Sequence, residues 1–172
     1  EFCNDFIETI HVKPGPFLQC CLFKRSLLHQ PEDLFDTNAI PSEDWDFFIN
    51  LSKRNPLIVH SPHIGFNWNY SPSSQSANLK AEANALEYII EKHWQDILDL
   101  CGKKVLSDHY RRIARVYERA ECFQNAAENY RYAYSINPTS IKNIWYRVLV
   151  ALDYNNSHQA ADYLRKLRKT LL

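Results

Sequence analysis

The spacing of apolar residues along the chain changes near residue 76. From Ala81 to Leu100 these residues recur three and four positions apart, which predicts one long amphipathic helix. Gly102 follows, and a glycine just past the last turn is typical of a helix C-cap. We therefore predict that residues 77–172 are all-α.

Before residue 76 the apolar residues form short runs instead. Phe17–Phe23 follows the turn sequence Pro14-Gly15-Pro16, which predicts a strand. Residues 57–60 and 63–68 predict two further strands, and residues 70–78, rich in serine and asparagine, predict a loop. The first region is thus expected to contain a sheet.

Two helices are expected among these strands. A short one covers Lys24–His29, and a longer one begins after Ser42 and ends before Pro56. Ser42 has a side chain that suits an N-cap. Apolar residues fall on two stripes of the longer helix, so we expect it to be covered on most of its sides.

Charge excludes one class of partner. The chain has 172 residues, with 20 acidic and 20 basic side chains, so no overall field attracts nucleic acid. The most basic stretch, Arg165 to Lys169, is explained by a solvated helix face.

The cysteines indicate a reducing compartment. Their number is 5, and they show no C-x-x-C spacing, which argues against a disulfide framework and structural zinc. No run approaches the ~20 apolar residues that span a bilayer. We expect a protein located in the cytoplasm or at the inner face of the membrane. The absence of methionine suggests that the sequence is a piece of a longer chain.

The helical region resembles a tetratricopeptide repeat. With Ser107 as the first position of a 34-residue unit, small, aliphatic and aromatic residues stand where that repeat requires them. A second unit from Ile141 keeps Ala160 but departs at Arg147 and Ala151, as a terminal repeat would. The matching positions are Tyr110, Ile113, Ala114, Tyr117, Ala126, Tyr130, Ala133 and Pro138.

An acidic cluster opens the helix after Ser42. Glu43, Asp44 and Asp46 fall in its first turn, where the helix dipole alone stabilises carboxylates. The cluster therefore needs no function when it is considered in isolation.

Residues 17–76 resemble the acceptor-side half of family-2 glycosyltransferases of GT-A fold. The resemblance rests on a linked series of motifs: Phe17–Phe23, Arg25-Ser26-Leu27-Leu28, Phe35-Asp36, Glu43-Asp44-Trp45-Asp46 and residues 58–76. It implies an α+β fragment of a Rossmann-like GT-A domain over residues 1–76, followed by the all-α tetratricopeptide-like hairpin region over residues 77–172.

The resemblance also implies a reaction. A sugar would pass from a nucleotide-sugar to a hydroxyl of a glycan or other acceptor, with inversion, and Asp44 would be the general base. Glu43 would orient the loop or touch the acceptor. Trp45 and Asp46 would anchor the helix, the first by packing and the second by a hydrogen bond.

Metal binding is not assigned to Asp44-Trp45-Asp46, although it has the form D-x-D. The metal-binding D-x-D of the family follows a strand in the nucleotide-binding half, and residues 1–34 do not supply that half. The chain is thus expected to hold no cofactor and to be inactive alone, whereas a complete parent enzyme would use Mg²⁺ or Mn²⁺.

Asn67 and Asn69 stand where many relatives carry an arginine and a histidine near the diphosphate. Neutral amides can donate hydrogen bonds there but bring no charge. His60 and His63 are read as ordinary surface or core histidines. The alternative to the enzyme is a non-catalytic interaction module that binds a protein partner through the tetratricopeptide-like helices.

Overall fold

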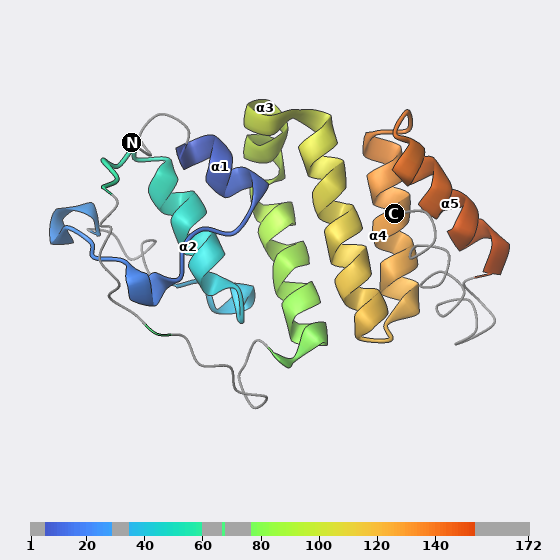
Figure 1. The fold of residues 1–172 in the computed structure, drawn as a ribbon, viewed down its shortest axis with the longest axis horizontal. Coiled ribbons are helices and arrows are strands. Elements are labelled where there is room, and N and C mark those ends of the chain that lie inside the picture. The colour runs from blue at the N-terminus through green and yellow to red at the C-terminus, as the bar shows by residue number, and fades with distance from the viewer. Residues whose placement is uncertain (1–5, 29–34, 60–66, 68–76, 154–172) are drawn as a thin grey trace.

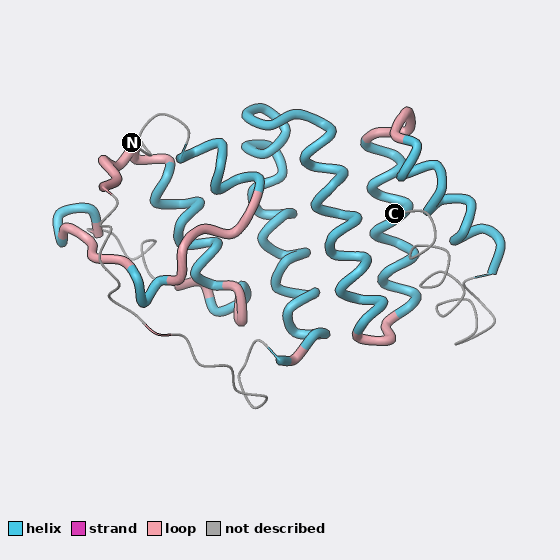
Figure 2. Tube along the Cα trace, in the orientation of Figure 1, coloured by secondary structure: helices cyan, strands magenta, loops and turns pink. Residues whose placement is uncertain are grey.

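The computed structural model describes residues 6–28, 35–59, 67 and 77–153, and all regular elements in these ranges are helical (Figures 1 and 2). The α-helices are α1 (Phe6–Val12), α2 (Glu43–Ser52), α3 (Leu79–Arg119), α4 (Phe123–Ile136) and α5 (Ile141–Asp153). Short 3₁₀ turns η1 (Leu18–Cys20), η2 (Arg25–Leu27) and η4 (Thr37–Ala39) connect the first two.

The strand predicted for Phe17–Phe23 is wrong. The backbone forms η1 instead, with Cys20 N donating to Phe17 O at 2.9 Å and Cys21 N donating to Leu18 O at 3.0 Å. These local bonds use groups that a strand would offer to a neighbour. The short helix predicted for Lys24–His29 is reduced to η2.

The strand predicted at residues 57–60 is also wrong for its described part. Residues 57–59 belong to no helix or strand, and Leu57 and Val59 are 84% and 80% exposed. A strand needs a partner ladder, and none lies beside them in the ranges given above. The prediction for residues 63–68 falls, apart from Asn67, outside the described residues, as does that for residues 70–76.

These findings overturn the α+β fold class and, with it, the GT-A resemblance. A Rossmann-like domain is built on a parallel sheet, whereas the described part of residues 1–76 contains only helices, turns and irregular chain. The short motifs that resemble those of the GT-A family therefore lie, where the structure describes them, in a backbone arrangement without a sheet.

Burial on most sides was correctly expected for α2. Trp45, Phe47, Phe48, Ile49 and Leu51 are all 7% exposed or less. Ser42 occupies the N-cap position, but its side chain makes no capping hydrogen bond.

Gly102 divides α3 into two antiparallel segments. Its φ of 78° and ψ of 172° interrupt the helix between residues 79–101 and 103–119. Figure 1 shows the chain rising through the first segment, turning sharply, and descending through the second. The helix is therefore interrupted at the predicted position, but the ψ of Gly102 differs from that of the left-handed conformation of a typical C-cap glycine.

Segment 103–119, α4 and α5 continue the up-and-down arrangement (Figure 1). Ala114 and Ala126 are fully buried, so the two helices that carry them can approach closely. Tyr130 stacks on Tyr146 of α5, with ring centroids 4.3 Å apart and planes 5° from parallel. The helical hairpin expected from the tetratricopeptide pattern is therefore present.

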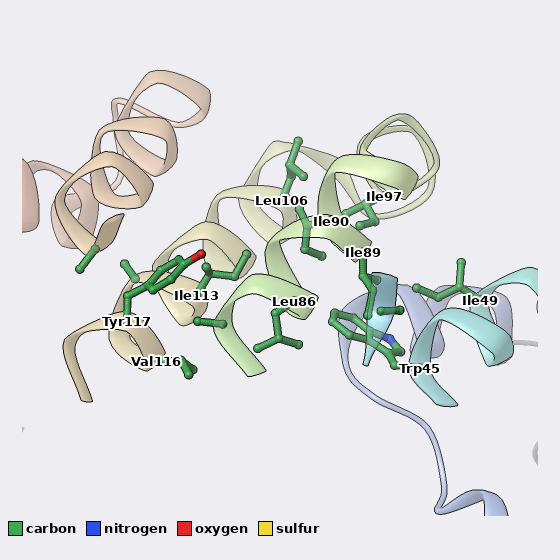
Figure 3. Close-up of a cluster of buried hydrophobic side chains, with 14 of the residues drawn as sticks. Trp45, Ile49, Leu86, Ile89, Ile90, Ile97, Leu106, Ile113, Val116 and Tyr117 are labelled. Carbon is green, nitrogen blue, oxygen red and sulfur yellow. The ribbon is translucent and has the colours of Figure 1, made fainter. Parts of the chain in front are cut away.

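One apolar core runs through the described part of the molecule. It includes Trp45 and Ile49 of α2, residues of both segments of α3, and Val150 of α5. Figure 3 shows the side chains of α2 and α3 meeting in this core. None of the described helices is both long enough and apolar enough to cross a membrane.

Candidate functional site

The acidic start of α2 presents two partly buried carboxylates, Glu43 and Asp44. Asp44 Oδ1 accepts a hydrogen bond from Trp45 N at 2.8 Å. Burial raises the pKa of Asp44, the bond from Trp45 opposes this effect, and the charge of Glu43 raises the pKa further. Glu43 Oε2 is buried without a hydrogen-bond partner. A raised pKa does not exclude a general base, which works best with a pKa near the working pH, so the role given to Asp44 stays a prediction.

The next two side chains of α2 turn into the core. Trp45 is 1% exposed, and its indole Nε1 donates to Ile10 O at 2.7 Å. Its ring lies 5.6 Å from that of His109, and the Arg112 guanidinium lies 5.6 Å from the Trp45 ring centroid. Trp45 thus joins α1, α2 and α3.

Asp46 is buried in a polar network between α2 and α3. Its Oδ1 lies 2.7 Å from His93 Nε2, and its Oδ2 accepts from Lys92 Nζ at 2.9 Å and from Asn50 Nδ2 at 3.2 Å. Burial alone would raise the pKa of Asp46, but the hydrogen bonds from His93 and Lys92 outweigh burial and lower it. The carboxylate is therefore held in its charged form.

The network extends from Asp46 in two directions. Lys92 also donates to Asp36 Oδ2 at 2.8 Å, and Tyr88 Oη donates to the same oxygen at 2.7 Å. In the other direction, His93 Nδ1 lies 3.5 Å from Lys53 Nζ, which pairs with Asp96 at 2.7 Å. The chain near η4, the end of α2 and segment 79–101 are thereby joined.

A buried Asp–His pair can orient a histidine that activates a nucleophile. Here Lys53, rather than a serine, threonine or cysteine, lies beside the second nitrogen of His93. Within the ranges that the structure describes, no group of three or more histidine, cysteine or acidic side chains could hold a metal ion. The arrangement is best suited to fixing α2 against α3.

The described members of the predicted site do not come together in one place. Asp44 and Asp46 lie in different environments, and Asn67 is exposed outside any helix. Asn69, His60 and His63 lie outside the described residues. The partners of Asp46 were missed because His93 and Lys92 are 47 and 46 positions away along the chain. No local pattern connects residues at such distances.

A second candidate is an apolar surface on α5, which we call the α5 stripe. Asn143, Tyr146 and Val150 face the body of the protein, since Asn143 and Val150 are buried and Tyr146 stacks on α4. The opposite face carries apolar residues at helical spacing that are 83%, 44%, 43% and 44% exposed in chain order: Ile141, Ile144, Trp145 and Val148.

Lys142 and Arg147 are exposed beside this stripe. No acidic residue occurs from residue 141 to residue 151. The α5 stripe is therefore an apolar strip with positively charged flanks.

No protein-family model, curated protein or solved structure matches the chain.

Proposed function

We propose that this chain is a non-catalytic, tetratricopeptide-like helical module that binds a partner protein through the α5 stripe. The observation that supports this function is the exposure of four apolar side chains at positions i, i+3, i+4 and i+7 of one helix. Exposed apolar surface rimmed by polar residues is typical of protein interaction sites. We also propose that the protein is cytoplasmic, as the cysteine pattern suggests.

The occupant we propose is an amphipathic helix of the partner, apolar on one side and acidic beside its apolar stripe. Helices of this kind bind apolar grooves and strips through anchors at i, i+3, i+4 and i+7. The flanking Lys142 and Arg147 favour acidic neighbours by charge complementarity.

Two other occupants are less consistent with the charges. Anionic membranes are typically recognised by clusters of about 4–8 basic residues, whereas the described side chains of α5 include only Lys142 and Arg147. The chain's own residues 154–172 contain Arg165, Lys166, Arg168 and Lys169, whose charges would be repelled by those flanks.

The test uses the full chain and a designed, fluorescein-labelled peptide of about 18 residues. The peptide carries leucine at helical spacing and glutamate on both flanks, and a scrambled peptide is the control. We expect a rise in anisotropy with micromolar affinity and a change in Trp145 emission. The pair Ile144→Asp and Val148→Asp should weaken binding at least ~10-fold, whereas Leu22→Asp, at a fully exposed position, should not.

The outcomes separate the occupants. No binding, or equal binding of the scrambled peptide, overturns the proposal. Binding to phosphatidylserine vesicles that exceeds binding to the peptide would identify a membrane surface instead. Binding of the peptide only after removal of residues 154–172 would show that the chain's own end covers the α5 stripe. A charge reversal, Lys142→Glu with Arg147→Glu, should shift preference toward a lysine-flanked peptide.

A further inference from the structure

Two side chains from other helices hold the end of α1. The last carbonyls of any helix lack partners within the helix. In α1, Ile10 O accepts from Trp45 Nε1 at 2.7 Å, and His11 O accepts from His109 Nε2 at 2.8 Å. α2 and α3 thus each supply a side-chain donor to α1.

Both histidines at this junction are buried. His11 is 0% exposed and His109 is 4% exposed. His109 must carry a proton on Nε2 to donate to His11 O. His11 Nδ1 lies 2.6 Å from Ile7 O and so carries the proton, which leaves Nε2 as a bare acceptor that is buried and without a partner.

A second proton on either ring would be poorly accommodated. It would place an N–H of His11 where no acceptor lies. On His109 it would create a buried positive charge near Arg112. Burying a charge without a partner is strongly unfavourable, so such a group favours any state in which it reaches water.

The charged groups around the two rings come from each helix packed against α1. Asp96 and His93 of α3 and Lys53 at the end of α2 face His11, and Arg112, Asp108 and His11 face His109. The carboxylates are already engaged: Asp96 pairs with Lys53, and Asp46 pairs with His93 and Lys92. Cys101 Sγ of α3 also donates to Glu8 O of α1 at 3.7 Å.

We propose that α1 is an acid-released latch: protonation of His11 and His109 detaches α1 from α2 and α3, whereas α4 and α5 stay folded. α4 meets segment 103–119 through Tyr132, whose ring centroid lies 5.6 Å from that of Tyr110. α5 meets it through Asn143, whose Oδ1 accepts from Arg111 Nη1 at 2.9 Å. Neither contact includes His11 or His109.

The direction of the effect follows from the two pKa values. Burial lowers the pKa of His109 to about 4, with the His11 carbonyl opposing and Arg112 adding to the decrease. Burial also lowers the pKa of His11, against the opposing effects of Ile7 O and Asp96. Folded-state pKa values below 6.5 mean that this stabilisation is complete above pH 6.5 and is lost as the pH falls toward 4. Linkage gives about a 30-fold rise in the opening constant at pH 5 for His109 alone.

The experiment is hydrogen exchange measured by mass spectrometry on the full chain at pH 8 and pH 5, corrected for intrinsic exchange rates. Protection of residues 6–13 should fall about 30-fold or more, and that of α4 should change less than about threefold. The double variant His11→Asn with His109→Gln keeps side-chain N–H donors near the same positions but does not titrate, so it should remove the pH dependence. His158→Gln is the matched histidine control.

A second measurement, on the wild type, tests the latch even if the double variant fails to fold. Wild-type histidine resonances followed by NMR should show His11 and His109 titrating together with the loss of α1 protection. The latch is overturned if protection of α1 is the same at both pH values. It is also overturned if both histidines titrate near 6.5 while α1 stays protected, or if the double variant opens in acid as readily as the wild type.

Discussion

Asp44 and Asp46 stand two positions apart on α2 and lie in opposite environments. Asp44 is partly buried and accepts one hydrogen bond from its own helix start, so burial raises its pKa. Asp46 is 1% exposed and accepts bonds from His93 and Lys92 of α3, which lower its pKa. Hydrogen bonds thus favour the charged form of the aspartate at position 46, whereas burial favours the neutral form at position 44.

Replacement of Asp46 by asparagine should be costly. Asp46→Asn removes the charge that His93 and Lys92 share in a buried site, and breaking one side of a buried ion pair typically costs about 3 kcal/mol or more. Urea unfolding followed by circular dichroism measures the change in free energy. Asp44→Asn is the matched control and should cost less than about 1 kcal/mol. Similar losses in both variants would contradict the role given to Asp46.

The sequence identified these acidic residues but not what surrounds them. Glu43 and Asp44 were placed correctly at a helix start, because a carboxylate near a helix N-terminus is a local feature. The charged carboxylate of Asp46 is stabilised by His93, whose Nε2 α3 places 2.7 Å from Asp46 Oδ1. That contact joins residues far apart in the chain, so periodicity could not reveal it.

At the scale of elements, the hairpin formed by α3 depends on one backbone conformation. Gly102 has a φ of 78° and a ψ of 172°, a region that is essentially restricted to glycine. Apart from the adjoining residues and the backbone of its own helix turn, no described atom lies within 4 Å of the place that a Cβ would occupy. A substitution there would be opposed by backbone strain alone, not by a steric clash.

Gly102→Ala should therefore lower the free energy of unfolding by about 1–3 kcal/mol. The measurement is chemical denaturation, and Lys103→Ala, at an exposed helical position, should change stability by less than about 0.5 kcal/mol. An alanine at position 102 that left stability unchanged would show that the chain can turn here without this conformation.

Another polar contact joins segment 79–101, segment 103–119 and α4. Tyr117 Oη donates to Glu87 Oε2 at 2.6 Å, and Asn129 Nδ2 donates to Glu87 Oε1 at 2.7 Å. Glu87 therefore connects three consecutive helical segments. The tetratricopeptide pattern predicted Tyr117 as a space-filling residue, but it did not predict the acceptor for its hydroxyl.

Tyr117→Phe tests this contact. It should cost about 1–3 kcal/mol, because Glu87 loses a buried donor while the ring still fills its space. Tyr132→Phe, which removes a hydroxyl from a side chain that is 55% exposed, is the control for thermal and urea unfolding. A loss no greater than that of the control would show that the hydroxyl contributes nothing to stability.

At the scale of the whole molecule, the apolar core formed by the described residues connects the regions on either side of residue 76. Trp45 of α2 and Ile89 of α3 belong to the same cluster as Val150 of α5. A division into units 1–76 and 77–172, as the sequence suggested, remains a prediction. Cooperative unfolding is the property that would distinguish one unit from two.

We expect the described regions to unfold together. In a variant with Trp68, Trp94 and Trp145 replaced by phenylalanine, Trp45 emission reports on α2, whereas circular dichroism at 222 nm reports mainly on α3 to α5. The two urea transitions should coincide within error, because removal of α2 would expose the core face of α3. Two separated midpoints would establish independent domains. Intact protein at pH 8 avoids any contribution from histidine protonation.

Local sequence signals were sufficient to predict several of the helices. Apolar spacing gave the long helix from Ala81, Gly102 gave its end, and the small and aromatic positions from Tyr110 to Ala133 gave the hairpin, because each signal lies within a few turns of chain. Short apolar runs such as Phe17–Phe23 do not carry that information, since a strand exists only if another strand pairs with it. Tertiary structure alone decided that no such pairing occurs in the described residues, that Asp46 meets His93, and that one face of α5 stays exposed. These three outcomes depend on which distant segments meet, and free energies of contact between distant segments are not encoded in local spacing.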